Sequence, residues 1–180
     1  MQLTSTGNIT ENQEIALAKI REAAGNGARL IVLPEATSQN FRSGRLDEQA
    51  QSLEGPFATA IQALAEELEV TVVAGMFCPA DTVERDGKTI NRVSNTALIA
   101  GPGVLGGYDK IHTYDAFDYR ESDTVLAGES LVAFDVDDLI VGVATCYDIR
   151  FPEQFKELAS QGAQLIVVPT SWADGPGKLE

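Results

Sequence analysis

The chain has few cysteines and no long apolar run among its 180 residues. Cys78 and Cys146 fall in different predicted strands, so we expect no disulfide framework and a cytoplasmic location, where thiols stay reduced. Apolar runs reach only five or six residues, as at 139–144, whereas a transmembrane helix needs about 20. The first seven residues lack the basic stretch and the apolar core of a secretion signal. The composition therefore predicts a soluble protein with no membrane partner.

Basic residues are also scarce. Lysine and arginine number 13 against 27 acidic residues, which gives a formal net charge of −14. A surface this negative repels nucleic acids and anionic membranes, so we expect a small-molecule substrate and no nucleic-acid partner. His112 is the single histidine, and the sequence shows no metal-ligand cluster, Ser-His-Asp set or phosphate-binding loop. Neither a metal nor a cofactor is expected.

What the sequence does contain is an alternation of helical and extended segments. Apolar spacing and helix-start signals predict helices over residues 12–24, 57–69 and 152–160. Short apolar runs predict strands over residues 30–33, 71–77, 97–99, 104–108, 131–135, 139–145 and 165–168. Asp86-Gly87 predicts a hairpin turn, and residues 111–130, which have no clear period, predict a long functional loop. The pattern indicates one α/β domain over residues 1–180, with mixed sheets covered by helices.

Two segments of the chain resemble each other. Residues 27–34 and 162–169 agree at six of eight positions, and each follows a helix and ends in a strand closed by proline. Parallel α/β units of this kind are common, so chance convergence is one explanation. The other is a pair of equivalent strands whose C-terminal ends lie side by side, where α/β folds build their sites.

Cys146 ends an apolar, β-branched run and is followed within a few residues by a helix-start signal. This setting places the thiol at the end of a buried strand and near the positive end of a helix dipole, both of which favour a reactive thiolate. The alternative is a small buried apolar residue, the role that we expect for Cys78.

Two further polar residues follow predicted strands. Glu35 stands at the exit of the first strand and is either a general base or a solvent-facing turn residue. Lys110 is either a surface lysine or a fixed cation for an oxyanion. His112 lies two residues from Lys110, so the two side chains point to opposite sides of an extended segment and His112 is expected to be structural.

Taken in order, Leu33-Pro34-Glu35, Tyr108-x-Lys110-x-His112 and the segment Cys146-Tyr147-Asp148-x-Arg150-Phe151-Pro152-Glu153 resemble the nitrilase superfamily of carbon–nitrogen hydrolases. The resemblance runs from about residue 4 to residue 176. It is closest to the branch that includes omega-amidase and deaminated-glutathione amidase.

This resemblance implies an αββα sandwich of two mixed sheets and a catalytic triad. Glu35 would be the general base, Lys110 the cation that stabilises the oxyanion, and Cys146 the nucleophile. A second active-site glutamate is matched best by Glu121, with Asp115 and Asp118 as competitors. Tyr147 would donate a backbone N–H to the oxyanion, and Thr170 and Trp172 would line the pocket. A homodimer or larger homo-oligomer is also implied.

The predicted function is hydrolysis of a non-peptide C–N bond in a small amide through a cysteine thioester, which gives an acid plus ammonia or an amine. The chain is shorter than members of this superfamily, so we expect an incomplete domain, clipped at the N-terminus and truncated at the C-terminus. The alternative function is therefore a catalytically inactive binding or assembly module of the same fold. A third reading is an unrelated α/β binding domain with a buried structural cysteine.

Overall fold

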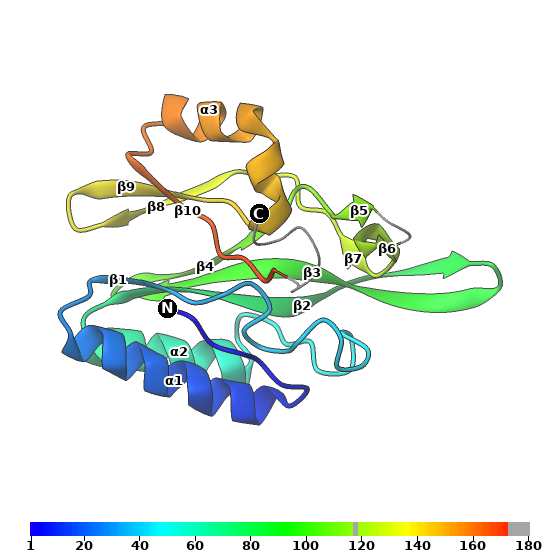
Figure 1. The fold of residues 1–180 in the computed structure, drawn as a ribbon, viewed down its shortest axis with the longest axis horizontal. Coiled ribbons are helices and arrows are strands. Elements are labelled where there is room, and N and C mark those ends of the chain that lie inside the picture. The colour runs from blue at the N-terminus through cyan, green and yellow to red at the C-terminus, as the bar shows by residue number, and fades with distance from the viewer. Residues whose placement is uncertain (117–118, 173–180) are drawn as a thin grey trace, which may run out of the picture.

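Two mixed β-sheets pack face to face with helices on both outer sides (Figure 1). The computed structural model describes residues 1–116 and 119–172, and every structural statement below refers to these residues. The predicted αββα sandwich of mixed sheets is confirmed. Within the described ranges, no helix is long and apolar enough to cross a membrane.

The larger sheet has five strands and is covered by two helices. Its main path runs β1 (Leu30–Val32), β2 (Thr71–Arg85), β3 (Lys88–Gly101) and β4 (Val104–Asp109), and β7 (Val125–Leu126) pairs with β3. The β1–β2 and β3–β7 pairs are parallel and the others antiparallel. The helices α1 (Ile9–Gly25) and α2 (Pro56–Glu67) bury apolar side chains against one face of this sheet.

The two helices start where local capping allows. The side chain of Asn8 accepts hydrogen bonds from the backbone N–H groups of Thr10 and Glu11, so α1 begins three residues before its predicted start. Pro56 occupies the first turn of α2, where its missing N–H has no cost.

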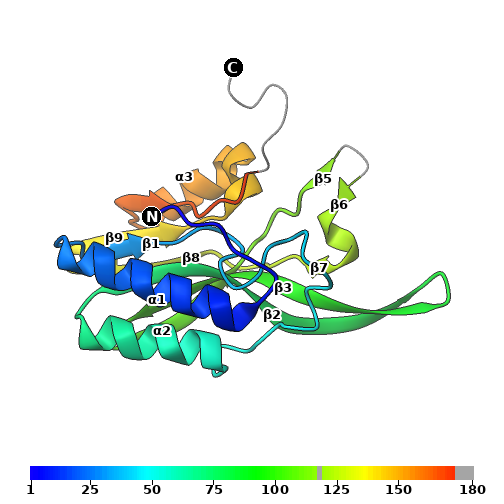
Figure 2. The same cartoon turned by 60° about the horizontal axis from the view of Figure 1, so that its bottom comes forward.

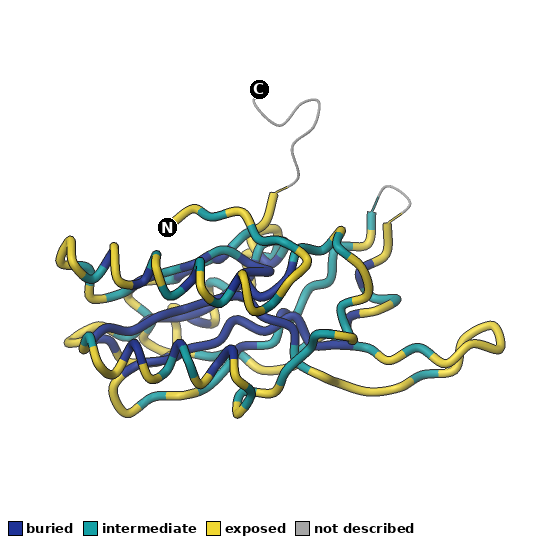
Figure 3. The backbone as a smooth tube through the Cα atoms, turned by 90° about the horizontal axis from the view of Figure 1, so that it is seen from below, coloured by how far each residue is buried: buried dark blue, intermediate teal, exposed yellow. Residues whose placement is uncertain are grey.

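The predicted hairpin turn is present between β2 and β3. Asp86 and Gly87 both have positive φ, 51° and 71°, as a two-residue turn between twisted strands requires. The outer halves of the two strands extend beyond the rest of the fold, and most of their residues are exposed (Figures 2 and 3). The strands are therefore much longer than the apolar run 71–77 that predicted the first of them.

The smaller sheet has the order β10 (Leu165–Val167), β9 (Leu139–Val143), β8 (Val132–Val136), and α3 (Pro152–Ser160) covers its outer face. Gly142 permits this packing, because a Cβ there would lie 3.2 Å from the methyl groups of Leu158 in α3. Side chains of both sheets form the core between them: Val73, Ala97, Ile99, Tyr108, Phe134, Val136, Val141, Val143 and Val167.

Residues 111–130, predicted as a long loop, hold only short elements. These are β5 (Asp115–Ala116), β6 (Tyr119–Arg120), the 3₁₀ helix η1 (Glu121–Asp123) and β7. Strands of two residues are too short to show an alternating pattern in the sequence, and they form only because they pair with other strands of the folded chain. The pairing of β7 with β3 fixes this segment against the larger sheet.

Candidate active site

Three chain segments end at one place between the sheets. Glu35 follows β1, Lys110 follows β4, and Cys146 opens a 3₁₀ helix, η2 (Cys146–Arg150), after β9. The two similar segments 27–34 and 162–169 also meet here, since the backbone N–H of Ser171 donates to Oε2 of Glu35 at 3.1 Å. The prediction of adjacent C-terminal ends is confirmed.

Backbone hydrogen bonds extend both similar segments past their formal strand ends. The N–H of Gly75 donates to the carbonyl of Pro34 at 3.1 Å, and the N–H of Cys146 donates to the carbonyl of Pro169 at 3.0 Å. Each proline carbonyl therefore holds the neighbouring strand in register up to the site.

Gly75 allows the backbone that carries Glu35 to lie directly on β2. A Cβ at this position would be 2.5 Å from the Ala36 nitrogen and 2.6 Å from the Glu35 Cα, closer than real Cβ atoms come. Ala36 itself has φ 58°, in the left-handed region. This close approach directs the Glu35 side chain, which is 3% exposed, into the protein.

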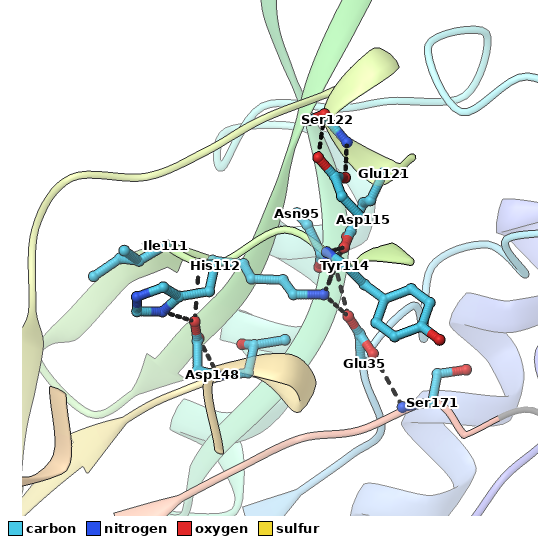
Figure 4. A network of polar contacts seen from close by, with 12 residues as sticks. Glu35, Asn95, Ile111, His112, Tyr114, Asp115, Glu121, Ser122, Asp148 and Ser171 are labelled. Carbon is cyan, nitrogen blue, oxygen red and sulfur yellow. Dashed lines mark hydrogen bonds and ion pairs between the residues drawn. The ribbon is translucent and has the colours of Figure 1, made fainter. Parts of the chain in front are cut away.

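Glu35, Asn95, Lys110 and Glu121 form a buried polar cluster, which we call the carboxylate–lysine cluster (Figure 4). Lys110 Nζ lies 3.1 Å from Oε1 of Glu35, and 3.1 Å and 2.8 Å from the two carboxylate oxygens of Glu121. Asn95 Nδ2 donates to Oε1 of Glu35 at 2.8 Å and to Oε1 of Glu121 at 3.0 Å. Every member is at most 3% exposed.

The cluster keeps its lysine charged. Burial on its own lowers the pKa of Lys110, but the nearby carboxylates of Glu35 and Glu121 outweigh that effect and the net shift is upward. Two carboxylates around one ammonium leave the cluster with one excess negative charge when all three groups are ionised. A fixed ammonium in a water-poor site can stabilise a developing oxyanion.

Cys146 is held in an unusual backbone conformation next to this cluster. Its φ is 46°, in the left-handed region that residues other than glycine rarely occupy, and such strain often marks a functional position. The thiol lies close enough to the Glu35 carboxylate and to Lys110 for both groups to act on its pKa.

Burial of the Cys146 thiol outweighs the strand-end and helix-dipole setting that favoured a thiolate. Burial, the largest effect, and the Glu35 carboxylate raise the pKa of the Cys146 thiol to about 12, although Lys110 and the Ser171 backbone N–H act in the opposite direction. The element that Cys146 opens is a five-residue 3₁₀ helix, and the longer helix α3 starts only at Pro152. Cys146 is therefore protonated at neutral pH and needs a base.

The buried carboxylate of Asp148 ties the cysteine turn to the lysine segment. It accepts hydrogen bonds from the backbone N–H of Thr145 at 2.8 Å, the Tyr108 hydroxyl at 2.6 Å and the His112 N–H at 2.9 Å. The His112 ring also contacts it through Nδ1 at 2.8 Å and stacks on Phe151. His112 is thus part of the scaffold, as its position relative to Lys110 predicted.

Of the competing carboxylates that the structure describes, Glu121 is the one that contacts Lys110. The Asp115 carboxylate instead accepts hydrogen bonds from the backbone N–H and the hydroxyl of Ser122, at 3.0 Å and 2.6 Å. Asp118 lies outside the described residues. The second glutamate predicted for the site is therefore in the cluster.

Tyr147, predicted to donate to the oxyanion, follows Cys146 in the chain, and Thr170 and Trp172, predicted to line the pocket, flank Ser171. Tyr147 is half-buried and makes edge contacts with the rings of Tyr114 and Phe151. Thr170 is half-buried, and Trp172 is 56% exposed. Their roles in binding substrate remain predictions.

Asn95, Asp148 and the Ser171 N–H contact site residues and were not singled out from the sequence. Asn95 offered one signal, because it is a polar residue within the strand that continues into the apolar run 97–99, and a buried polar side chain needs partners. A backbone N–H such as that of Ser171 leaves no trace in composition. Among the described residues, no group of three or more His, Cys, Asp or Glu side chains is arranged to hold a metal ion.

Comparison with known proteins gives consistent matches. The sequence model of the carbon–nitrogen hydrolase family matches residues 1–178. A hydrolase of Mycobacterium tuberculosis H37Rv is 45% identical over 184 residues, which cover 99% of this chain and 62% of the relative. The deaminated glutathione amidase of Escherichia coli O157:H7 is 34% identical over 180 residues, which cover 98% of this chain and 66% of that protein. The chain thus spans less than two thirds of the length of these relatives.

A solved structure of the amidase from Nesterenkonia sp. AN1 has the same fold. Its TM-score is 0.79 at 19% identity, and the match covers 99% of this chain and 68% of that one. That structure is a glutamate-to-glutamine variant and shows the Michael addition of acrylamide at the active-site cysteine.

Proposed function

Because this chain belongs to the carbon–nitrogen hydrolase family, in the branch of the deaminated glutathione amidases, we propose that it hydrolyses a small amide through a thioester on Cys146. One observation carries the proposal. The Cys146 thiol is close enough to the buried carboxylate of Glu35 for that carboxylate to raise its pKa, and the ammonium of Lys110 lies 3.1 Å from the same carboxylate. Nucleophile, base and oxyanion-stabilising cation are then within reach of one carbonyl group.

The first half of the reaction forms the thioester. Glu35 takes the thiol proton as Cys146 Sγ attacks the amide carbon, and the carbonyl oxygen becomes an oxyanion. Lys110 and the backbone N–H of Tyr147 stabilise this oxyanion. Glu35 then gives the proton to the amide nitrogen, the C–N bond breaks, and ammonia or an amine leaves.

The second half releases the acid. Glu35 removes a proton from a water molecule that attacks the thioester carbon, and Lys110 again stabilises the oxyanion. Collapse of this intermediate breaks the C–S bond, and Glu35 returns its proton to the sulfur. The steps consume one amide and one water and give one acid and one ammonia or amine.

The raised pKa of Cys146 explains why a buried base is needed. A thiol with a pKa of about 12 contains almost no thiolate at neutral pH. Transfer of its proton to Glu35 during attack avoids forming a free thiolate in a buried site. Glu121 keeps Lys110 in place, since it lies 2.8 Å from Nζ.

The substrate is proposed to be a small linear amide, and the protein is proposed to act in the cytoplasm as a homodimer or larger homo-oligomer. The relatives that support this choice include one named as an amidase. The net charge of −14 favours small-molecule over nucleic-acid partners.

The test is ammonia or amine release by the protein in its full natural length, measured with a panel of small amides, carbamoyl compounds and nitriles. We expect turnover with at least one amide. Mass spectrometry of a Glu35→Gln variant exposed to that amide should then place an acyl group on the peptide that contains Cys146. A Cys78→Ala variant is the matched control and should keep its turnover.

Two results would contradict the proposal. An acyl group on the Cys78 peptide would assign the nucleophile to the other cysteine. Absence of release from every compound by a folded protein would favour the non-catalytic binding or assembly module.

A further inference from the structure

The carboxylate–lysine cluster contains a geometric feature that the triad does not need. Two donors, Lys110 Nζ and Asn95 Nδ2, bridge the same pair of acceptors, Oε1 of Glu35 and Oε1 of Glu121. One donor is charged and the other is neutral. The four distances lie between 2.8 Å and 3.1 Å, so both donors hold the two carboxylates at a fixed separation.

We propose that Asn95 is a positioning residue that fixes the orientation of the Glu35 carboxylate for proton transfer with Cys146. The inference rests on the proposed function of Glu35 as the base. With Oε1 of Glu35 occupied by Lys110 and Asn95, Oε2 faces the strand end that follows β10, where it accepts the Ser171 N–H. Oε2 is then the oxygen that takes the thiol proton.

An amide is the side chain suited to this place. The two N–H bonds of its NH₂ group diverge, so each can serve one carboxylate, and the amide adds no charge to a cluster of two carboxylates and one ammonium. Asn95 Oδ1 is buried without a partner among the described residues, a costly arrangement that results from turning the NH₂ group toward the carboxylates. The main chain contributes as well, because the Asn95 carbonyl accepts the N–H of Lys110 at 2.9 Å.

Asn95 also matters when charge develops on the substrate. As an oxyanion forms, the ammonium of Lys110 interacts with it and its hold on the two carboxylates weakens. Asn95 keeps both carboxylates in place during this step. Without the amide, Glu35 and Glu121 would repel each other with only the lysine between them.

The test compares Asn95→Leu, which keeps the size and removes the donors, with Asn95→Asp, which also adds a third carboxylate. Thr96→Val is the matched control, because it removes the hydrogen bond that the buried Thr96, the next residue of β3, donates to Asp109. Amide turnover and the alkylation of the Cys146 peptide by iodoacetamide are measured against pH for each variant. Asn95→Ser, which keeps one donor, replaces Asn95→Leu if the latter does not fold.

For Asn95→Leu we expect kcat to fall about 10²-fold with KM changed less than threefold, since a misplaced base affects the chemical step. The acid limb of the pH–rate profile should move to higher pH by about one unit, because ionised carboxylates lose a donor. For the same reason the carboxylate attracts the thiol proton more strongly, so alkylation of Cys146 should require higher pH. Asn95→Asp should show the larger shift, and Thr96→Val should show none.

The two readouts separate this inference from the proposed function. Alkylation of Cys146 needs no amide hydrolysis, so a shift in Asn95→Leu and not in Thr96→Val supports the positioning role even if every amide fails as substrate. If the alkylation profile is unshifted in both Asn95→Leu and Thr96→Val, or if it shifts equally in both, Asn95 is a structural residue and the inference is wrong.

Discussion

The two similar segments, residues 27–34 and 162–169, make equivalent backbone contacts and lead to different chemistry. Each runs parallel to its neighbour strand and offers a proline carbonyl to that neighbour, at Gly75 in one case and at Cys146 in the other. The first segment brings a buried carboxylate, Glu35, to the site. The second brings a backbone N–H, from Ser171, which donates to that carboxylate.

The difference between the segments shows how a repeated backbone unit acquires separate roles. The first strand lies between helices and the second sheet, and Leu33 is fully buried, whereas its counterpart Val168 is half-buried. A carboxylate in the drier location has fewer water molecules to solvate it, so it needs protein donors. The second segment and the carboxylate–lysine cluster supply those donors.

The largest effect is expected at Cys146, whose backbone N–H donates to the Pro169 carbonyl of the second segment. Cys146→Ala removes the nucleophile while its backbone N–H can still donate to Pro169, so we expect a folded protein whose turnover is lower by about 10⁴-fold or more. Ammonia release and thermal unfolding measure the two properties. Residual turnover near that of the wild type would rule out the thioester route.

At the end of the first segment, Glu35→Gln should lower turnover by about 10²–10⁴-fold, because the base is lost. The same change should make the thiol more acidic, since the Glu35 carboxylate raises the pKa of Cys146. Alkylation of the Cys146 peptide is therefore expected at lower pH than in the wild type. A shift toward higher pH would show that Glu35 does not face the thiol.

Gly75→Ala tests the contact beneath the first segment. The added Cβ must displace the backbone of Glu35 and Ala36, so we expect the free energy of unfolding to fall by about 1–3 kcal/mol and kcat to fall about 10²-fold. Gly106→Ala in β4 is the matched control, because nothing lies within 4 Å of a Cβ there. Chemical denaturation and steady-state kinetics distinguish the two variants, and equal behaviour would contradict the role assigned to Gly75.

The smallest effect is expected beside the second segment. Gly142, which pairs with Ile166 of β10, would place its new Cβ against the side-chain ends of Leu158 and not against backbone. We expect Gly142→Ala to lower the free energy of unfolding by about 1 kcal/mol or less and to leave turnover unchanged. A loss of turnover like that of Gly75→Ala would mean that the two segments are equally sensitive.

Local signals in the sequence predicted much of the fold. Pro152 marks the start of α3 and Asp86-Gly87 the hairpin, because both act through backbone geometry that a few residues determine. The short strands in residues 111–130 were missed because their pairing depends on distant partners. The helices and longer strands begin and end at residues that differ from the predicted ones, because helix caps and strand register determine where each element stops.

Sequence motifs likewise predicted which side chains meet at the site, but not the burial and the hydrogen bonds that surround them. Glu35, Lys110, Glu121 and Cys146 come together as the resemblance implied, with the first three in the cluster and the thiol close enough to Glu35 for the carboxylate to raise its pKa. The raised pKa of the thiol could not be predicted from the sequence, since it depends on burial and on a carboxylate 111 positions away in the chain. Asn95 was missed because its partners lie 60 and 26 positions away.

The left-handed backbone at Cys146 also limits which other nucleophiles the position can hold. A φ of 46° is strained for any side chain and worst for a β-branched one. Serine has the same shape as cysteine and fits this backbone, whereas threonine would add a methyl group at the strained position. An attempt to convert the site from thioester to oxygen-ester chemistry would therefore have to use serine, and threonine would fail on conformation before its reactivity could matter.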